Sequence, residues 1–383
     1  MTAQVGQYVG NQTPEGLINF SLGQPAPHLL PIKMIGEAAA KLAEADRLLL
    51  QYGATPGFED FRRSLGEFLS DAHGSPVDPD QLFLSGAISL SLSLVADVFA
   101  RRGGVIACED PTYFLAKGIF DSAGIEVVGI PTDAEGLRVD ALRQRIESGT
   151  RVDLVYTIPS FQNPTGSCAS EARREALVAL AEEMDFFVAA DEPYNLLYFD
   201  ELRPRPLAEL DRGRDRVLSV SSFTKILAPG LRLGWLQASA PLLERFGAHG
   251  TLRSGGSLNP VMAYVVAELM RTGQLARHLE LLREQLGKRR DALCEALREE
   301  LPELRFEVPA GGYFVWGQLP EGESSRALNR AAKAHGVAFT PGYRCAIEGR
   351  FDDRFRLSFA FYDPGELREG VRRIAAARRA AKD

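Results

Sequence analysis

Cysteine and histidine are scarce in this sequence, and neither occurs at the spacing of a metal site or a disulfide framework. The four cysteines lie far apart without a C-x-x-C pair, and the five histidines include no H-E-x-x-H motif. A zinc ribbon or a small disulfide-rich domain would need more of these residues, placed close together. We therefore expect no metal site, and a protein of the cytoplasm, where thiols stay reduced.

The chain also lacks a long hydrophobic run and an excess of positive charge. Its start, MTAQVGQYVGNQTPEG, has neither the basic nor the apolar segment of a signal peptide. The longest apolar stretches, such as Val261–Met270, are too short to cross a bilayer. Lys and Arg total 44 and Asp and Glu total 51, so the formal net charge is −7. We therefore expect neither nucleic acid nor a membrane as a partner.

What the chain does contain is the composition of an ordinary globular protein. Its 383 residues are 45% hydrophobic and 25% charged, which suits two or three domains. Apolar strand-like runs alternate with helix-like runs, a pattern that predicts an α/β fold with helices on both faces of a sheet. We expect a three-layer α/β/α large domain with a mostly parallel seven-stranded sheet, from Leu82–Ser85, Val105–Cys108, Val127–Ile130, Leu154–Ile158, Phe186–Ala190, Val217–Ser221 and Leu231–Leu236.

After residue 260 the pattern changes to that of a smaller α+β domain. Pro260–Glu300 reads as one long helix, and Pro364–Ala380 as a basic terminal helix. We predict an N-terminal arm at 1–30 that packs with the small domain, a large domain at 31–260 that begins with the helix Pro31–Leu50, and a small domain at 261–383. Its antiparallel sheet is expected from Arg305–Val308, Tyr313–Gln318, Val337–Thr340 and Arg356–Phe359.

The first sign of chemistry is a lysine that follows hydroxyl residues directly after a strand-like run. Ser222-Phe223-Thr224-Lys225 ends this segment, and Arg232 lies seven residues further on. A lysine can form a Schiff base with a carbonyl cofactor, and Ser222 and Arg232 can bind phosphate oxygens. A surface lysine and arginine on an ordinary strand–loop–strand segment would explain the motif equally well.

Further motifs lie at the carboxyl ends of other strand-like runs. Asn163-Pro164-Thr165-Gly166 and Asp191-Glu192-Pro193-Tyr194 each follow one, although both are also common turn sequences. Ser85-Gly86-Ala87 begins a helix, where backbone amides can bind an anion, and Tyr113 could stack on a flat ring. Open α/β sheets bind ligands at the carboxyl ends of their strands, so several motifs on one edge favour a ligand site.

In this order the motifs resemble those of the fold-type I aminotransferases of class I/II, which depend on pyridoxal phosphate. Phe20–Pro25, Gln51–Gly57 and Gly311–Trp316 also look like motifs of that family, and the resemblance extends from Ile18 to Ala376. The chain looks closest to the subgroup of 2-aminoadipate, aromatic and kynurenine aminotransferases. The main matching motifs are G-A, P-T-Y, N-P-T-G, D-E-P-Y, S-x-[ST]-K-x-x-x-P-G-x-R-x-G and R-L-S-F.

The resemblance implies roles for residues around a bound pyridoxal 5′-phosphate. Lys225 matches the Schiff-base lysine, which also serves as acid and base and needs a lowered pKa for both tasks. Asp191 matches the aspartate that keeps the pyridine nitrogen protonated, so that the ring takes up electrons. Asn163 and Tyr194 match the pair that hydrogen-bonds the ring hydroxyl oxygen. The implied catalytic residues are Lys225, Asp191 and Tyr194.

The implied phosphate site draws on several segments and on a second subunit. Tyr52 matches a tyrosine that reaches the phosphate of the neighbouring subunit, which implies a homodimer with shared active sites. Many relatives carry glutamine where this chain has Ile88, so one hydrogen bond to the cofactor is expected to be missing. The other implied contacts are Ser85, Gly86, Ala87, Ser222 and Arg232 on the phosphate, with Tyr113 stacked on the ring.

Arg356, in the R-L-S-F motif, matches the arginine that binds the substrate α-carboxylate. A planar guanidinium binds a carboxylate through two hydrogen bonds, which lysine does not reproduce. The backbone amide of Gly23 and the side chain of Asn163 complete the implied substrate site. Other arginines lie nearby in the sequence, and Arg356 could instead be a rim residue, but its place in the motif favours the substrate role.

The implied function is an aminotransferase that moves an amino group from an L-α-amino acid to a 2-oxo acid by a ping-pong mechanism. A pyridoxal-phosphate enzyme that eliminates, cyclises or oxidises an amino acid would need the same Lys225, Asp191 and Arg356. A non-catalytic regulator is the third alternative, which the intact Lys225 and the negative charge disfavour. The apolar arm, including Phe20, is expected to line the substrate pocket.

Overall fold

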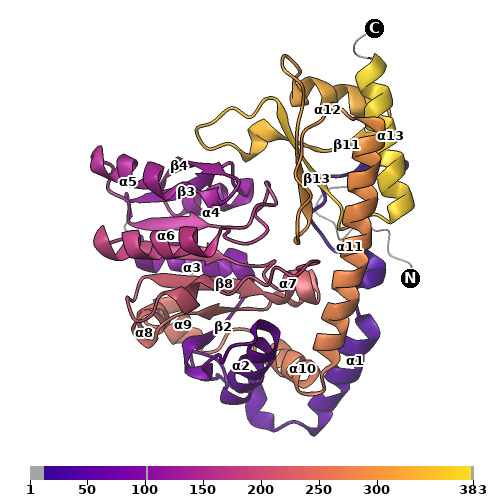
Figure 1. The fold of residues 1–383 in the computed structure, drawn as a ribbon. Helices are drawn as coiled ribbons and strands as arrows, with labels where there is room; N and C mark the ends of the chain where they lie inside the picture. The colour runs from indigo at the N-terminus through magenta and orange to yellow at the C-terminus, as the bar shows by residue number, and fades with distance from the viewer. Residues whose placement is uncertain (1–12, 101, 381–383) are drawn as a thin grey trace.

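The computed structural model describes residues 13–100 and 102–380, with a large sheet at the centre of one half of the molecule (Figure 1). The strand order is β2-β9-β8-β7-β6-β3-β4-β5. Strands β8, β7, β6, β3 and β4 pair in parallel, whereas β9, β2 and β5 run antiparallel to their neighbours. Their bounds are β2 Leu82–Ser85, β3 Val105–Asp110, β4 Glu126–Asp133, β5 Gly136–Leu137, β6 Leu154–Thr157, β7 Phe187–Asp191, β8 Val217–Ser222 and β9 Gly234–Gln237.

The seven strands expected from the sequence are present, and the sheet is mostly parallel as predicted. An eighth strand, β5, has two residues and follows β4 in a tight hairpin through Gly136, whose φ is +87°. Two residues are too few to show a strand pattern in the sequence. The predicted run Leu231–Leu236 forms a strand only from Gly234, because a 3-10 turn ends at Arg232 with a φ of +48°.

Helices cover both faces of the sheet, which confirms the three-layer arrangement. Ile106 and Cys108 of β3 pack on one face with helices α3 and α4. Ala107, between them, packs on the other face with α5 and α6. Alternate side chains of a strand point to opposite faces, so a strand that is apolar throughout is buried on both sides. The helices of this half are α2 Glu59–His73, α3 Ala87–Phe99, α4 Phe114–Ser122, α5 Val139–Glu147, α6 Glu171–Glu183, α7 Phe223–Ile226, α8 Ala240–Gly247 and α9 Gly250–Gly255.

The C-terminal part forms the expected α+β arrangement, with a three-stranded antiparallel sheet in the order β10-β13-β12. The predicted single helix Pro260–Glu300 is two helices, because Gly273 adopts a φ of +67° between them. The predicted strand Arg305–Val308 is wrong, since only Arg305 pairs, in an isolated bridge with Gln318. The elements are α10 Pro260–Arg271, α11 Gln274–Glu300, β10 Phe314–Gln318, α12 Ser325–Ala334, β12 Thr340–Pro341, β13 Arg354–Ser358 and α13 Pro364–Ala380.

The N-terminal segment contacts the smaller half of the molecule. Its strand β1 (Ile18–Asn19) pairs in parallel with β11 (Val337–Ala338). This pairing supports the predicted packing of the arm, of which residues 1–12 lie outside the described residues. Helix α1 (Ile32–Ala40) is shorter than the predicted helix Pro31–Leu50, which continues as two short 3-10 turns. The division into an arm, a large domain and a small domain remains a prediction.

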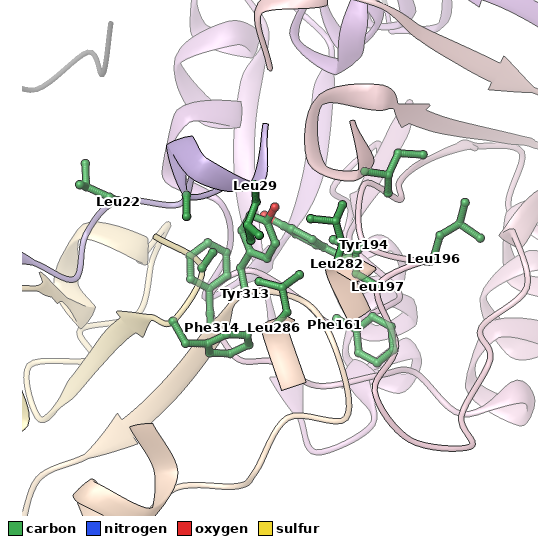
Figure 2. Packing of buried hydrophobic residues seen from close by; sticks show 14 of the residues in the cluster. Leu22, Leu29, Phe161, Tyr194, Leu196, Leu197, Leu282, Leu286, Tyr313 and Phe314 are labelled. Atoms are coloured by element: carbon green, nitrogen blue, oxygen red, sulfur yellow. The ribbon is translucent and has the colours of Figure 1, made fainter. Parts of the chain in front are cut away.

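One hydrophobic cluster joins the arm, the long helix α11 and the loops at the edge of the large sheet (Figure 2). Phe20 is fully buried, with its ring centre 6.3 Å from that of Tyr362. Ser85, another predicted site residue, is equally buried, so the expectation that Phe20 lines a substrate pocket stays a prediction. The cluster holds the side chains of Leu22, Leu29, Tyr194, Leu282, Leu286, Tyr313 and Phe314 against one another.

Candidate active site

The motifs singled out in the sequence meet at one edge of the large sheet. Strands β3, β6, β7 and β8 are parallel, so their carboxyl ends lie on the same side. Asp191 is the last residue of β7, and Lys225 lies in the short helix α7 directly after β8 (Figure 1). Tyr113 and Asn163 lie in the segments that follow β3 and β6. Residues from four segments are thus placed around one region.

Lys225 is held by a backbone carbonyl of the N-terminal arm. Its Nζ donates a hydrogen bond of 2.8 Å to the oxygen of Gly23. Burial lowers the pKa of Lys225 to about 8. Asp191 opposes this shift, whereas the positive charges of Arg356 and Arg232 add to it. The neutral amine is therefore accessible near neutral pH, as a nucleophile or a general base requires.

One carboxylate oxygen of Asp191 has a hydrogen-bond partner, and the other has none among residues 13–100 and 102–380. Its Oδ2 accepts a hydrogen bond of 2.7 Å from the Tyr156 hydroxyl, while Oδ1 is buried without a partner. Burial raises the pKa of Asp191 to about 7, against the hydrogen bond from Tyr156 and the charge of Lys225. A buried acceptor without a donor is costly, so a cationic N–H group placed at Oδ1 would stabilise this site.

The residues predicted to bind a phosphate meet around Gly234. Ser85 of β2 and Ser222 of β8 both pair with Gly234 of β9, from its two sides. A Cβ atom on Gly234 would lie 3.1 Å from both Ser85 Oγ and the Cα of Ala87, so glycine permits this close approach. The Ser85 hydroxyl is buried without a partner in the described part of the chain. Unpaired amides at the start of α3 lie beside it, and Ala87 has a φ of +67°.

Ser222 and Arg232 flank this corner in different ways. Ser222 Oγ caps α7 by accepting a 2.9 Å hydrogen bond from the amide of Thr224. Arg232 is exposed, and its guanidinium makes one 3.4 Å hydrogen bond to the oxygen of Pro229. The side-chain amide of Asn259 donates to the backbone oxygen of Arg232 at 3.2 Å, which fixes the turn and leaves the guanidinium free to meet an anion.

Arg356 and Asn163 connect the small sheet with the large one. Arg356 Nη1 donates to Asn163 Oδ1 at 2.8 Å. Its Nη2 donates to the oxygen of Ser21 at 3.0 Å and to Thr340 Oγ1 at 3.2 Å. Nε is buried without a partner among the described residues, and burial lowers the pKa of Arg356. A buried guanidinium with a spare N–H is suited to an anionic ligand such as a carboxylate.

Aromatic side chains enclose this region. The rings of Tyr194 and Tyr313 lie 5.3 Å apart between the arm and α11 (Figure 2). The Tyr313 hydroxyl donates to the backbone oxygen of Lys225 at 3.2 Å. Burial raises the pKa of Tyr113, and Asp191 is the strongest charge that acts on its hydroxyl. Tyr313 thus contacts Lys225 and Tyr194, and Tyr113 lies close enough to Asp191 to feel its charge.

Two predicted residues lie apart from these contacts. Tyr52 is 85% exposed and does not join the other site residues of its own chain. Its expected partner is the phosphate of a neighbouring subunit, and that role stays a prediction. Ile88 packs partly into the hydrophobic cluster of the sheet, and its side chain offers no hydrogen bond.

Sequence reasoning missed Tyr156 and Thr340, which bind Asp191 and Arg356, and it gave Tyr313 no role. Tyr156 could have been found, because a tyrosine in a buried apolar strand must find a partner for its hydroxyl. Thr340 gives no such signal, because it lies in a two-residue strand of the second sheet. Its contact with Arg356 depends on the pairing of β12 with β13.

Residues 13–100 and 102–380 show no sign of a membrane span or a metal cluster. No helix there has both the length and the apolar content that a bilayer crossing requires. Nor do three or more His, Cys, Asp or Glu side chains gather there as a metal ion would need.

Known proteins share both the sequence and the fold. The aromatic-amino-acid aminotransferase 1 of Thermococcus litoralis is 33% identical over 367 residues, which cover 94% of this chain and 87% of that protein. The α-aminoadipate aminotransferase of Thermus thermophilus, solved with N-(5′-phosphopyridoxyl)-L-leucine, has a TM-score of 0.85 at 32% identity over 99% of this chain and 95% of that one. The kynurenine aminotransferase of Pyrococcus horikoshii has a TM-score of 0.88 at 30% identity over 100% and 96%.

The match extends over the residues that build the site. The sequence model of the family described as aminotransferase class I and II covers residues 15–374, from the arm that holds Lys225 through Gly23 into helix α13. The three relatives carry aminotransferase names, and the two solved ones share the fold over nearly their whole length. This chain therefore belongs to the class I and II aminotransferase family.

Proposed function

We propose that this protein is a pyridoxal-phosphate-dependent aminotransferase. It transfers an amino group from an L-α-amino acid to a 2-oxo acid in two half-reactions, and the first product leaves before the acceptor binds. The observation that carries this proposal is the amine of Lys225, with its pKa lowered to about 8, within reach of the charges of Asp191 and Arg356. The phosphopyridoxyl compound bound to the Thermus thermophilus relative supports the same cofactor.

The residues present fit pyridoxal phosphate. Asp191 Oδ1 is a buried acceptor without a donor, and the protonated ring nitrogen of the cofactor would supply one. The Ser85 hydroxyl is a buried donor without an acceptor beside the free amides of α3, and the phosphate would supply one. Lys225 offers an amine to the cofactor aldehyde. Two groups that lack a partner and one amine thus match three functional groups of one molecule.

We assign the contacts of the cofactor to residues on several segments of the chain. Asp191 meets the ring nitrogen, Asn163 and Tyr194 meet the ring hydroxyl oxygen, and Tyr113 stacks on the ring. When bound, the cofactor supplies an aldehyde that condenses with amines and a protonated ring that takes up electrons. The phosphate is held by Ser85, Gly86, Ala87, Ser222 and Arg232, together with Tyr52 of a second copy.

Lys225 moves the proton that the reaction requires. As a neutral amine its Nζ takes a proton from the substrate Cα, and as an ammonium group it returns one. Burial lowers the pKa of Lys225 to about 8, which brings the two forms close in free energy near neutral pH. The hydrogen bond to the oxygen of Gly23 holds Nζ in place between these events.

Arg356 binds the α-carboxylate of the substrate. Its guanidinium is already fixed by Asn163 on one side and by Ser21 and Thr340 on the other, so little ordering remains when the substrate arrives. The free Nε–H donates to the carboxylate, and the amide of Gly23 adds a second donor. Donor and acceptor both carry this carboxylate, so one arginine serves both half-reactions.

The names of the relatives suggest which amino acids to test as donors. Their names point to aromatic amino acids, 2-aminoadipate and kynurenine as candidate donors.

A homodimer with shared sites would bring the exposed Tyr52 to the phosphate of the other subunit. All four cysteines are free thiols, which is consistent with the cytoplasm.

The proposal is tested with purified protein loaded with pyridoxal phosphate. Each amino acid of a panel is added without an acceptor, and pyridoxamine phosphate and the 2-oxo product are quantified. We expect both products in equal amounts, with reversal on addition of 2-oxoglutarate or pyruvate. Lys225→Ala should lower the rate by about 10²–10⁴-fold, the range of general acid–base catalysis.

Two results would redirect the assignment. Ammonia released in the absence of an acceptor would favour elimination or another reaction at the substrate Cα, which uses the same residues. Protein that binds pyridoxal phosphate and never yields pyridoxamine phosphate with any amino acid would refute the aminotransferase, and protein that does not bind it would favour the non-catalytic alternative.

A further inference from the structure

Glu109 is a buried carboxylate to which no role has been assigned so far. It is the residue before the end of β3 and is 1% exposed. Its Oε1 accepts a hydrogen bond of 2.6 Å from Thr157 Oγ1. Its Oε2 accepts two more, from the amide of Ile158 at 3.1 Å and from Gln162 Nε2 at 3.0 Å. Glu109 therefore ties the end of β3 to the segment that follows β6.

Gln162 extends this connection in two directions. Its Nε2 also donates to the backbone oxygen of Pro111 at 2.8 Å. Its Oε1 accepts from both the amide and the hydroxyl of Thr165 at 2.8 Å. The backbone of Gln162 closes the same turn, since its oxygen accepts from the amide of Gly166 at 2.7 Å. One side chain, 1% exposed, thus holds the turn that carries Asn163.

These contacts end at residues of the active site. Asn163 is the neighbour of Gln162, and its Oδ1 accepts from Arg356 Nη1 at 2.8 Å. Tyr113 lies two residues after Pro111. The residues that we assign to the ring hydroxyl, the ring face and the substrate carboxylate therefore share one buried support.

We propose that Glu109 is a positioning residue that, through Gln162, fixes Asn163 relative to Tyr113 and so orients Arg356 and the cofactor ring. The consequences of this inference for catalysis rest on the proposed function. The hydrogen bonds that hold the turn of Asn163 do not depend on it. Glu109 touches neither substrate nor cofactor in this arrangement.

The chemistry of the pocket explains why a carboxylate is needed. Thr157, Ile158 and Gln162 all present donors, and an ionised carboxylate accepts at both oxygens. Glutamine has the same shape, but its NH₂ group would face a donor and lose at least one hydrogen bond. Burial raises the pKa of Glu109 to about 7, so experiments at about pH 8.5 compare the ionised side chain with the amide.

Glu192 provides a matched control. It is 2% exposed, burial raises its pKa to about 7 as well, and its Oε1 accepts from the amide of Leu207 at 2.9 Å. Its hydrogen bond with Leu207 leads into the loop before β8 rather than to Gln162 or the turn that carries Asn163. Glu109→Gln and Glu192→Gln therefore make the same chemical change at equal burial, and both are expected to lower the unfolding temperature.

The first measurement is hydrogen–deuterium exchange of residues 160–168 in protein without cofactor. We expect about tenfold faster exchange in Glu109→Gln than in wild type or Glu192→Gln, because a lost buried hydrogen bond weakens local structure by about that factor. Titration with pyridoxal phosphate and steady-state kinetics follow. Glu109→Gln should raise both the Kd of the cofactor and the KM of the amino donor about tenfold, while Glu192→Gln changes neither more than about twofold.

If Glu109→Gln and Glu192→Gln showed the same exchange rates, the same Kd and the same KM, the proposal would be overturned. A merely structural role of Glu109 predicts that the two changes affect these quantities equally. Thr157→Val keeps the carboxylate and removes one donor, and it replaces Glu109→Gln if that variant does not fold. It should change the same three quantities in the same direction by about two- to fivefold. The exchange result stands whether or not the wild type transaminates, so failure of the proposed function is recognised separately from failure of this inference.

Discussion

At the scale of single residues, the site is marked by buried polar atoms whose hydrogen bonding is incomplete. Asp191 Oδ1, Ser85 Oγ and Arg356 Nε each lack a partner among the described residues. Such groups destabilise a folded chain unless a ligand completes them. Unpaired buried polar atoms also occur elsewhere in the described residues, so these three gain weight because they lie in the motifs, and the motifs gain weight from them in turn.

Asp191 gives a pH-dependent prediction for the protein without cofactor. Burial raises its pKa from 3.8 to about 7, so the folded state holds this proton more tightly than the unfolded state. The resulting contribution to the free energy of unfolding is complete below about pH 4 and is lost as the pH rises through 7. The free energy of unfolding falls by up to about 1.4 kcal/mol per pH unit in this range. Asp191→Asn lacks this titration. The free energy of unfolding of the variant minus that of the wild type should therefore be larger at pH 8 than at pH 5.

Urea unfolding of both proteins at the two pH values measures this difference. Other titrating groups are shared and cancel in the comparison. Asp97→Asn, at an exposed position of α3, is the control and should follow the wild type at both pH values. An unchanged difference between Asp191→Asn and the wild type would mean that Asp191 does not titrate in this range.

Arg356 gives a prediction about substrate binding. Its two terminal nitrogens serve Asn163 on one side and Ser21 on the other, which the single ammonium group of lysine does not reproduce. Arg356→Lys should raise the KM of donor and acceptor by about 10–100-fold, the size of one or two hydrogen bonds to a charged group, with less effect on the Kd of the cofactor. Arg368→Lys, in a surface ion pair on α13, is the control. Steady-state kinetics with an unchanged KM would place the carboxylate site elsewhere.

Much of the site at this scale was predictable, because its residues sit in short motifs at strand ends. Lys225, Asp191 and Asn163 belong to this group. Glu109 and Gln162 lie within two residues of such motifs, yet their importance depends on a contact between β3 and the segment after β6. The sequence places them 53 residues apart and contains no mark of that pairing.

At the scale of elements, a loop of the smaller half reaches across to the large sheet. The segment between residues 345 and 354 extends from the second sheet toward β4 (Figure 1). Asp110, at the end of β3, accepts hydrogen bonds from the amides of Ile347, Glu348 and Gly349 at 2.6–2.9 Å. Glu348 in turn forms a 3.0 Å ion pair with Arg145. These contacts hold the chain that leads into β13 and Arg356.

Replacing Asp110 by asparagine should loosen this loop. The NH₂ group would face at least one amide donor, at a cost of about 1–3 kcal/mol in the free energy of unfolding. Asp121→Asn removes an exposed pair with Lys117 and should cost less than about 0.5 kcal/mol. Urea unfolding and hydrogen exchange of residues 346–349 test the difference, and equal effects of the two changes would show that the loop is held by other contacts.

The elements themselves were predictable to different degrees. The seven main strands have continuous apolar runs, because they are buried on both faces. The break at Gly273 was missed because glycine is tolerated inside helical patterns as well as at their ends. The false strand at Arg305–Val308 has the right local composition, but it forms only one bridge to the small sheet.

At the scale of the whole molecule, several large apolar side chains near the start of the described chain are exposed. Ile32, Leu48, Leu50 and Tyr52 are each more than 70% exposed in one chain. They lie within 21 residues, on α1 and the turns that follow it. The proposed homodimer, if it covers this segment, would remove these side chains from water. In that dimer, the family resemblance implies that Tyr52 would reach the phosphate of the other subunit.

Shared active sites predict complementation between two inactive variants. In Lys225→Ala the amine is lost, and in Tyr52→Ala the contact to the partner's phosphate is lost, so each homodimer is impaired at both sites. A mixed dimer combines one doubly altered site with one that has both Lys225 and Tyr52. After unfolding and refolding of an equal mixture, half of the dimers are mixed, and activity per chain should recover to about a quarter of the wild type. Sedimentation measures the dimer independently, and an activity no greater than the mean of the two parents would show that each site is built from one chain.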